Sequence, residues 1–234
     1  MMSRTLRQTL QVALLALAFT LGGCAVLPTA KPAPQATSAD RVTRPTSEPY
    51  KGDLSIFEDP ERDRKLQIER VMDILGVKAG ANVADIGAGS GWFTVRAARR
   101  VGPMGTVYAV EINRDYLRYI EERAQRERLT NIRTVLGKED DPLLPLASID
   151  AVLILKTYHE IAQPVRLMKN LRRALRKGAL VGIIDRNGTG DDHGVARETV
   201  VEEVGRAGFE LVADYDFVKP DGMDYFLIFR ATGR

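Results

Sequence analysis

The segment Val83–Thr94 constrains the fold more than any other part of the chain. It begins inside a short apolar run, residues 82–86, which has the length of one buried strand. Gly87, Gly89 and Gly91 follow in alternation, and an amphipathic segment starts directly after them. Strand, glycine turn and helix in this order are typical of a ligand-binding crevice in a parallel α/β sheet. Glycine is needed there because it adopts positive φ and lets the backbone approach the ligand.

The glycine spacing argues against three common ligand motifs. Trp92 stands where a dinucleotide fingerprint has its last glycine, and the Lys-Ser/Thr that ends a phosphate loop is missing. A nucleophile elbow, G-x-S-x-G, would need glycine two residues before and after Ser90, where this chain has Ala88 and Trp92. What remains is D-x-G-x-G-x-G, beginning at Asp85. An acid in this turn suits a ligand that carries positive charge, whereas it would repel a pyrophosphate. A glycine turn without any ligand is the alternative.

A second signal lies in residues 105–111, which read as a strand that ends in Glu111. This acid comes 24 residues after Gly87. A carboxylate at the tip of the second strand, about 20 residues past a glycine loop, is placed to accept both ribose hydroxyls of a nucleoside. A single Glu at a strand end is ordinarily solvated, but its pairing with the loop favours nucleoside binding.

The loop and Glu111 together resemble the S-adenosylmethionine (SAM) site of the class I methyltransferases, and the resemblance extends from about residue 52 to the end of the chain. It implies that Asp85 and the three loop glycines surround the methionyl part of SAM. It also implies that Glu111 binds the ribose. The expected activity is SAM-dependent transfer of a methyl group to an unidentified acceptor, most simply a small molecule. Homology does not identify that acceptor.

The same resemblance suggests a third contact, to the adenine. The family pattern G-D-A-x-x-L-P carries an acid that binds the adenine amino group. Aligned on residues 144–145, this acid is Asp140, with its neighbour Asp141 as a rival because the loop is long. A solvated acidic turn is the alternative for either residue. Lys156, directly after the fourth predicted strand, is a further candidate for cofactor binding.

Substrate-facing groups are expected in residues 156–160, because the fold places the end of the fourth strand on the ligand side. His159 is the candidate catalytic base, with Tyr158 beside it. Alternatively, both residues cap the next helix and line the pocket wall. His193 is expected to be a loop residue. No group of His and Cys has metal-ligand spacing, so the sequence predicts no metal site.

The pattern of apolar segments predicts an α/β fold, with a seven-stranded, mostly parallel, doubly wound sheet of the Rossmann-like methyltransferase type and a C-terminal antiparallel hairpin. The predicted strands are residues 82–86, 105–111, 132–136, 149–155 and 179–184, followed by the hairpin 209–217 and 224–231. The predicted helices are residues 59–75, 91–101, 114–128, 164–176 and 197–207.

The chain divides into three predicted segments: a signal peptide, a linker and a folded domain. Residues 1–23 resemble a bacterial lipoprotein signal peptide, with two arginines and then a ten-residue apolar core, too short for a membrane span. Cys24, the only cysteine, stands at the position that such proteins acylate. Residues 24–50 contain five prolines and predict an extended linker. Residues 51–234 form the predicted methyltransferase domain.

Charge and location restrict the expected partners. The net charge is +3, but residues 51–234 hold 29 basic and 29 acidic side chains, which does not favour nucleic acid as a partner. A lipid anchor on Cys24 would hold the protein at a membrane of the cell envelope. Because SAM is cytosolic, two alternatives stay open. Either the chain is an active enzyme, cytoplasmic if the start is misassigned, or it is an exported lipoprotein that keeps the fold as a non-catalytic binding module. The sequence does not indicate an oligomeric state.

Overall fold

A computed structural model of the chain describes residues 42–47, 52–189, 193–219 and 221–233. The predicted signal peptide, Cys24 and most of the predicted linker lie outside these residues. Within the described ranges, no helix is both long enough and apolar enough to cross a membrane.

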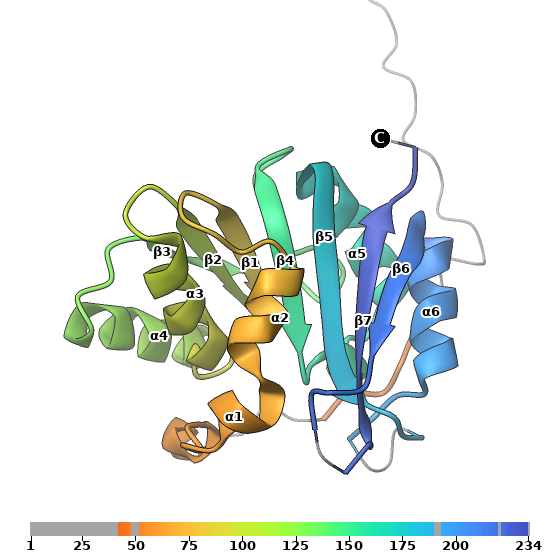
Figure 1. Cartoon of the computed structure of the whole chain (residues 1–234), viewed down its shortest axis with the longest axis horizontal. Coiled ribbons are helices and arrows are strands. Elements are labelled where there is room, and N and C mark those ends of the chain that lie inside the picture. The colour runs from red at the N-terminus through yellow and green to blue at the C-terminus, as the bar shows by residue number, and fades with distance from the viewer. Residues whose placement is uncertain (1–41, 48–51, 190–192, 220, 234) are drawn as a thin grey trace, which may run out of the picture. The chain divides into compact units, whose positions relative to one another are not determined.

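The centre of the fold is one seven-stranded sheet in the order β3-β2-β1-β4-β5-β7-β6 (Figure 1). Strands β1 to β5 pair in parallel, whereas β7 pairs antiparallel with both β5 and β6. The bounds are Asn82–Ile86 (β1), Thr106–Glu111 (β2), Ile132–Leu136 (β3), Ile149–Leu155 (β4), Leu175–Arg186 (β5), Phe209–Tyr215 (β6) and Asp224–Ala231 (β7). The predicted fold class and C-terminal hairpin are confirmed.

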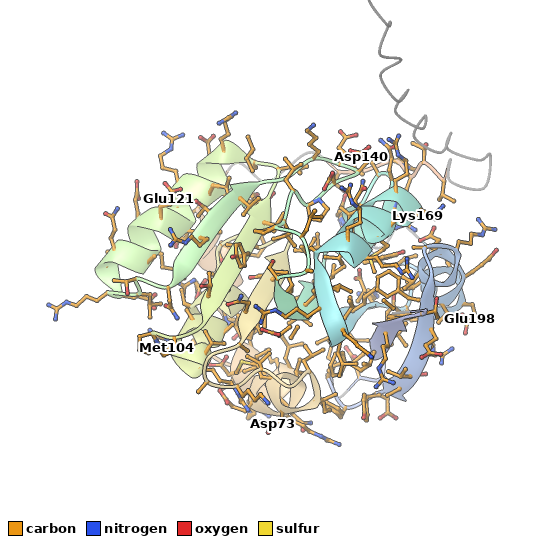
Figure 2. The ribbon with its side chains drawn as sticks, turned by 90° about the horizontal axis from the view of Figure 1, so that it is seen from above. Asp73, Met104, Glu121, Asp140, Lys169 and Glu198 are labelled. Carbon is orange, nitrogen blue, oxygen red and sulfur yellow. The ribbon has the colours of Figure 1, made fainter. Side chains whose placement is uncertain are left out.

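Helices cover both faces of the sheet. They are η2 (Leu54–Phe57), α1 (Arg62–Leu66), α2 (Ile68–Ile74), α3 (Trp92–Val101), α4 (Arg114–Arg126), η3 (Tyr158–Glu160), α5 (Pro164–Ala174) and α6 (Arg197–Arg206). In Figure 1, α2 and α3 lie in front of the sheet and α6 behind it. One apolar cluster joins the sheet to α2 and α3, and another joins it to α5 and α6. Figure 2 shows Asp73, Glu121 and Glu198 on the outer surfaces of α2, α4 and α6. The amphipathic pattern of these segments thus places apolar residues on the sheet.

Apart from shifts of one or two residues at element ends, the structure differs from the prediction at two places. The single helix expected over residues 59–75 is broken at Gln67, whose left-handed backbone (φ 47°) separates α1 from α2. A glutamine rarely adopts this conformation, so nothing in the apolar spacing signals the break. The fifth strand begins at Leu175, inside the segment predicted as helix, and Leu175 pairs with Ile149.

The described part of the predicted linker, residues 42–47, contacts the domain. Both carboxylate oxygens of Glu203 on α6 accept hydrogen bonds of 2.8 Å from Arg44. Arg44 also donates to the backbone carbonyl of Tyr158 at 2.8 Å. Residues 42–47 have no helix or strand and are hydrogen-bonded to the domain, while the assignment of residues 24–50 to an extended linker stays a prediction. A buried glutamate needs a charged partner, and the linker segment supplies it.

Gly105, in the turn between α3 and β2, is packed closely against Ala81 and Val101. A methyl group added at this position would lie 2.5 Å from the backbone oxygen of Ala81 and 2.6 Å from the Cβ of Val101. Because backbone cannot move away cheaply, we expect Gly105→Ala to lower the free energy of unfolding by about 1–3 kcal/mol in urea denaturation. Gly205→Ala, in α6 where the added methyl meets no atom within 4 Å, is the control and should not destabilise the protein. Equal stability of the two variants would contradict the packing described here.

Candidate functional site

The glycine loop joins β1 to α3 at the carboxyl end of the strand. Gly87, Gly89 and Gly91 all have positive φ, of 70°, 54° and 74°. A methyl group added at Gly87 would collide with the side chain of Thr157, whereas one at Gly89 would meet no protein atom within 4 Å. The loop therefore requires glycine for its conformation, and the space beside Gly89 is open.

Glu111, at the end of β2, lies directly against this loop. The backbone N–H of Gly89 donates to its Oε2 at 3.2 Å. The N–H groups of Ile112 and Asn113 donate to its Oε1 at 2.8 Å and 3.2 Å. The carboxyl group is buried, and this burial raises its pKa. The predicted proximity of Glu111 to the glycine loop is confirmed, since the two elements are in hydrogen-bond contact.

Asp85 lies beneath the same loop and is also buried. Its Oδ2 accepts a hydrogen bond of 2.6 Å from the hydroxyl of Thr94 on α3. Burial raises the pKa of Asp85 to about 6, although the Thr94 hydrogen bond and the positive charge of Arg62 act in the opposite direction. Two buried acids thus flank the loop, one below it and one beside it.

The raised pKa of Asp85 predicts a pH dependence of stability. Between its ordinary pKa of 3.8 and about 6, the folded state binds more protons at Asp85 than the unfolded state does, so stability falls as the pH rises through this window. We expect Asp85→Asn to gain about 2 kcal/mol relative to the wild type between pH 4 and pH 8. Urea unfolding of both proteins at the two pH values measures this difference. A difference that does not change with pH would contradict it.

The other predicted cofactor residues are engaged elsewhere. Asp140 pairs with Arg166 on α5 at 2.9 Å. Asp141 accepts the N–H of Leu143 at 2.9 Å and so caps its own turn. The ammonium of Lys156 forms an ion pair with Asp224, at the start of β7. In the sheet order, β7 and β2 lie on opposite sides of β4, so Lys156 is directed away from Glu111. The structure therefore brings together the loop and Glu111, but not these three side chains.

The chain after β4 places a histidine beside a buried acid. The Nδ1 atom of His159 lies 2.9 Å and 3.0 Å from the two carboxylate oxygens of Asp185, at the end of β5. The backbone N–H of His159 also donates to Asp185, at 3.0 Å. An ionised carboxylate only accepts hydrogen bonds, so Nδ1 is the donor to Asp185, and in the neutral form of the imidazole the lone pair is on Nε2. This dyad requires β4 and β5 to be neighbours, which the local sequence around His159 does not reveal.

Tyr158 does not accompany His159 at the open edge. Its side chain has no exposed surface and belongs to the apolar core between the sheet, α5 and α6. The guanidinium of Arg44 lies 5.6 Å from its ring centre. A fully buried phenol cannot contact an acceptor, so the predicted catalytic role of Tyr158 is replaced by a structural one.

Glu58, just before α1, and Arg62, the first residue of α1, contact the glycine loop and the start of α3, and no sequence pattern indicated these contacts. Glu58 accepts hydrogen bonds from the hydroxyl of Ser90 at 2.9 Å and from Arg123 of α4 at 2.8 Å. Arg62 lies over the ring of Trp92, at 4.4 Å from its centre. These contacts fix the loop from outside. No motif marks them, because the partners come from three separate elements.

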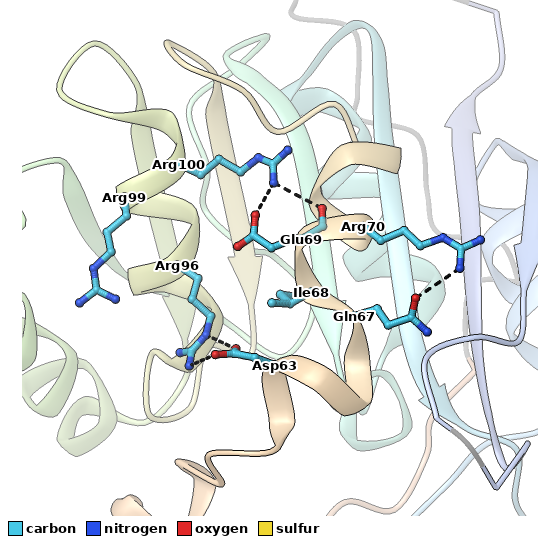
Figure 3. A pocket seen from close by; sticks show the side chains of 8 residues that line it. All are labelled: Asp63, Gln67, Ile68, Glu69, Arg70, Arg96, Arg99 and Arg100. Atoms are coloured by element: carbon cyan, nitrogen blue, oxygen red, sulfur yellow. Dashed lines mark hydrogen bonds and ion pairs between the residues drawn. The ribbon is translucent and has the colours of Figure 1, made fainter.

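A shallow groove on the outer surface of α2 and α3 is a separate feature (Figure 3). Its lining includes Arg96 and Arg100, which form ion pairs with acids of α1 and α2. None of the loop glycines, Glu111 or His159 lines it. The groove is therefore not the predicted cofactor site.

An open α/β sheet with a glycine loop against a strand-end carboxylate defines a Rossmann-like nucleoside-binding class of domain. Within this class, residues 77–204 match the family model described as "Methyltransferase domain". The match covers more than half of the chain, and the chain belongs to this family. Together with the sheet order and the closing hairpin, this makes it a member of the class I methyltransferases.

Individual relatives match over shorter lengths. A nocamycin O-methyltransferase of Saccharothrix syringae is 34% identical over 83 residues, which are 36% of this chain and 30% of the relative. A demethylmenaquinone methyltransferase of a Geobacillus species is 24% identical over 113 residues, 48% of each protein. The chain thus spans 30% to 48% of the length of these curated relatives.

Solved structures agree on the fold. A SAM-dependent methyltransferase from Aquifex aeolicus has a TM-score of 0.68 and 23% identity, covering 76% of this chain and 98% of the other. Fibrillarin from Aeropyrum pernix, solved with natively bound SAM, has a TM-score of 0.55 and 18% identity, covering 71% and 73%. At these identities the likeness concerns the fold alone.

Proposed function

We propose that the protein binds SAM between the glycine loop and Glu111 and transfers its methyl group to a small-molecule acceptor held near His159. The observation that carries this proposal is the 3.2 Å contact between the N–H of Gly89 and Glu111, beside open space at Gly89. The loop would bind the methionyl part of SAM and Glu111 the ribose hydroxyls. Asp140 or Asp141 remains the proposed adenine contact, and would have to turn from its present partner, as would Lys156.

In this site the residues mainly position the reactants. Bound SAM would supply an electrophilic methyl group on its sulfonium. The loop and Glu111 hold the nucleoside in one orientation, which converts the transfer into an in-line reaction between fixed partners. Asp185 holds His159 so that the lone pair of Nε2 is available. That lone pair could take the proton of an acceptor hydroxyl directly, or bind a metal ion that ionises the hydroxyl.

The names of the relatives support a small molecule as the methyl acceptor. Nocamycin and demethylmenaquinone, which appear in those names, are small molecules rather than nucleic acids. The balanced charge of residues 51–234 agrees with this choice. Incubation of the full chain with SAM labelled in the methyl group and a panel of small phenols, carboxylic acids and amines tests it. We expect label in at least one class, and none with Glu111→Ala. Label in nucleic acid alone would overturn the acceptor class.

The location of the protein is part of the same proposal. The apolar core before Cys24 and the small residues beside it support export and acylation, so that a lipid on Cys24 anchors the domain to a membrane of the cell envelope. In that location a non-catalytic binding module is the second candidate function. Mass spectrometry of the native protein separates the alternatives. An acylated N-terminal Cys24 supports the anchor, whereas an intact Met1 places the protein in the cytoplasm.

A further inference from the structure

Three potential metal ligands meet beside the proposed acceptor site. They are Nε2 of His159, Oε1 of Glu160 and Nδ1 of His193, and all three atoms lie within 4.8 Å of one another. Glu160 Oε1 is 3.6 Å from the first nitrogen and 3.7 Å from the second. Both separations are too long for hydrogen bonds. Both nitrogens do lie within ion-pair distance of Glu160, and the two imidazole rings meet edge to face with their centres 6.1 Å apart. Three potential metal ligands therefore converge on one point.

Two of the three side chains are held in place from behind. Asp185, whose side chain has no exposed surface, fixes the ring of His159 through Nδ1 and leaves Nε2 directed at Glu160. The second oxygen of Glu160 accepts the backbone N–H of Ser47 at 2.6 Å. His193 approaches from the loop before α6, and its side chain is 75% exposed. The arrangement is preformed on one side and open on the other.

We propose that His159, Glu160 and His193 bind a divalent transition-metal ion of the Zn²⁺ type. Two imidazoles and one carboxylate are nitrogen and oxygen ligands that such ions prefer. Metal–ligand bonds of about 2.0–2.1 Å place tetrahedral ligands about 3.4 Å apart. The observed 3.6 Å and 3.7 Å differ from that spacing by a few tenths of an ångström.

The hydrogen bond from His159 to Asp185 supports the same assignment. A metal-bound histidine ordinarily donates its other ring N–H to a carboxylate or carbonyl, which fixes the tautomer that binds the ion. Asp185 supplies this partner as a positioning residue and does not itself contact the ion. Sequence spacing could not reveal the set, because His159 and Glu160 lie in η3 whereas His193 comes from the loop before α6.

Three protein ligands leave a coordination position free for a substrate oxygen. Provided that the proposed function is correct, an acceptor hydroxyl could bind there. Its O–H bond would break with the proton passing to solvent water. The oxygen would then attack the methyl carbon, while the C–S bond breaks and its electron pair stays on sulfur.

The test is a Zn²⁺ titration of untagged full-length protein, freed of metal with a chelator and followed by calorimetry and by imidazole NMR. The chain has only two histidines and both belong to the site, so both sets of imidazole signals must change together at one equivalent. We expect His193→Ala, an exposed position that should leave folding intact, to weaken binding at least tenfold. Asp185→Asn should weaken it about 10- to 100-fold. Glu210→Gln and Cys24→Ser, matched controls outside the site, should bind as the wild type does.

Two outcomes would overturn the metal site: no saturable binding, or binding that His193→Ala leaves unchanged. A parallel titration with SAM separates this proposal from the proposed function. SAM binding without Zn²⁺ binding would remove the metal site alone. Zn²⁺ binding without SAM binding would leave the metal site standing and remove the proposed function.

Discussion

Replacing Glu111 with alanine is expected to weaken SAM binding about 30- to 150-fold. The two ribose hydroxyls would lose hydrogen bonds to a charged carboxylate, and each such bond contributes about 1.5–3 kcal/mol. In the variant, water can replace part of these hydrogen bonds, so we expect the binding free energy to weaken by about 2–3 kcal/mol in total. Calorimetry of SAM binding to the full chain measures the change. Glu122→Ala, on the exposed surface of α4, is the matched control and should bind SAM as the wild type does.

A second substitution in the same site separates ligand contact from folding. A methyl group at Gly89 would enter open space, so Gly89→Ala should cost only the strain of a non-glycine residue at φ 54°, about 1 kcal/mol. If SAM fills that space, the variant folds but loses SAM binding. If both Gly89→Ala and Glu111→Ala bound SAM with wild-type affinity, the SAM site would have to lie elsewhere.

The largest expected effect on stability comes from Arg44. Its removal would leave Glu203 buried without a charged partner, because only 6% of that side chain is exposed. We expect Arg44→Ala to lower the free energy of unfolding by about 3 kcal/mol in urea denaturation. This loss of stability would come from the unpaired charge of the buried Glu203 carboxylate. The double variant Arg44→Met with Glu203→Leu, which replaces both charges by apolar groups, should therefore recover most of it.

The same variant tests whether residues 42–47 are packed against the rest of the domain. Arg44 donates to the carbonyl of Tyr158, and Ser47 to the carboxylate of Glu160, so this segment is bonded to η3. If Arg44→Ala unfolded at the same midpoint urea concentration as the wild type, the ion pair between Arg44 and Glu203 would not stabilise the fold as described. A double variant that is no more stable than the single one would contradict that stabilisation as well.

Most of the sheet could be predicted because buried strands and glycine turns leave strong local signals. The bounds of β1, β3 and β4 agree with the apolar runs, and Gly87 and Gly91 have the positive φ that their spacing implies. The break at Gln67 could not be predicted, since its backbone is left-handed and glutamine rarely adopts that conformation. Local sequence predicts elements wherever local and tertiary forces agree.

The site followed the same rule. The meeting of Glu111 with the glycine loop was predictable because parallel strands end at one edge of the sheet. The pairing of His159 with Asp185 depends on β4 and β5 being neighbours, and the pairing of Arg44 with Glu203 joins residues 159 positions apart. Tyr158 was misjudged because its position in the chain does not show which way its ring turns.

The most direct test of the central claim is a SAM titration of the full chain followed by the backbone amide NMR signals of Gly87, Gly89 and Gly91. We predict saturable changes in these three signals at one equivalent of SAM, with smaller changes at the glycines far from the loop. Saturable binding of SAM that leaves all three amide signals unchanged would contradict the assignment of the site to this loop and Glu111.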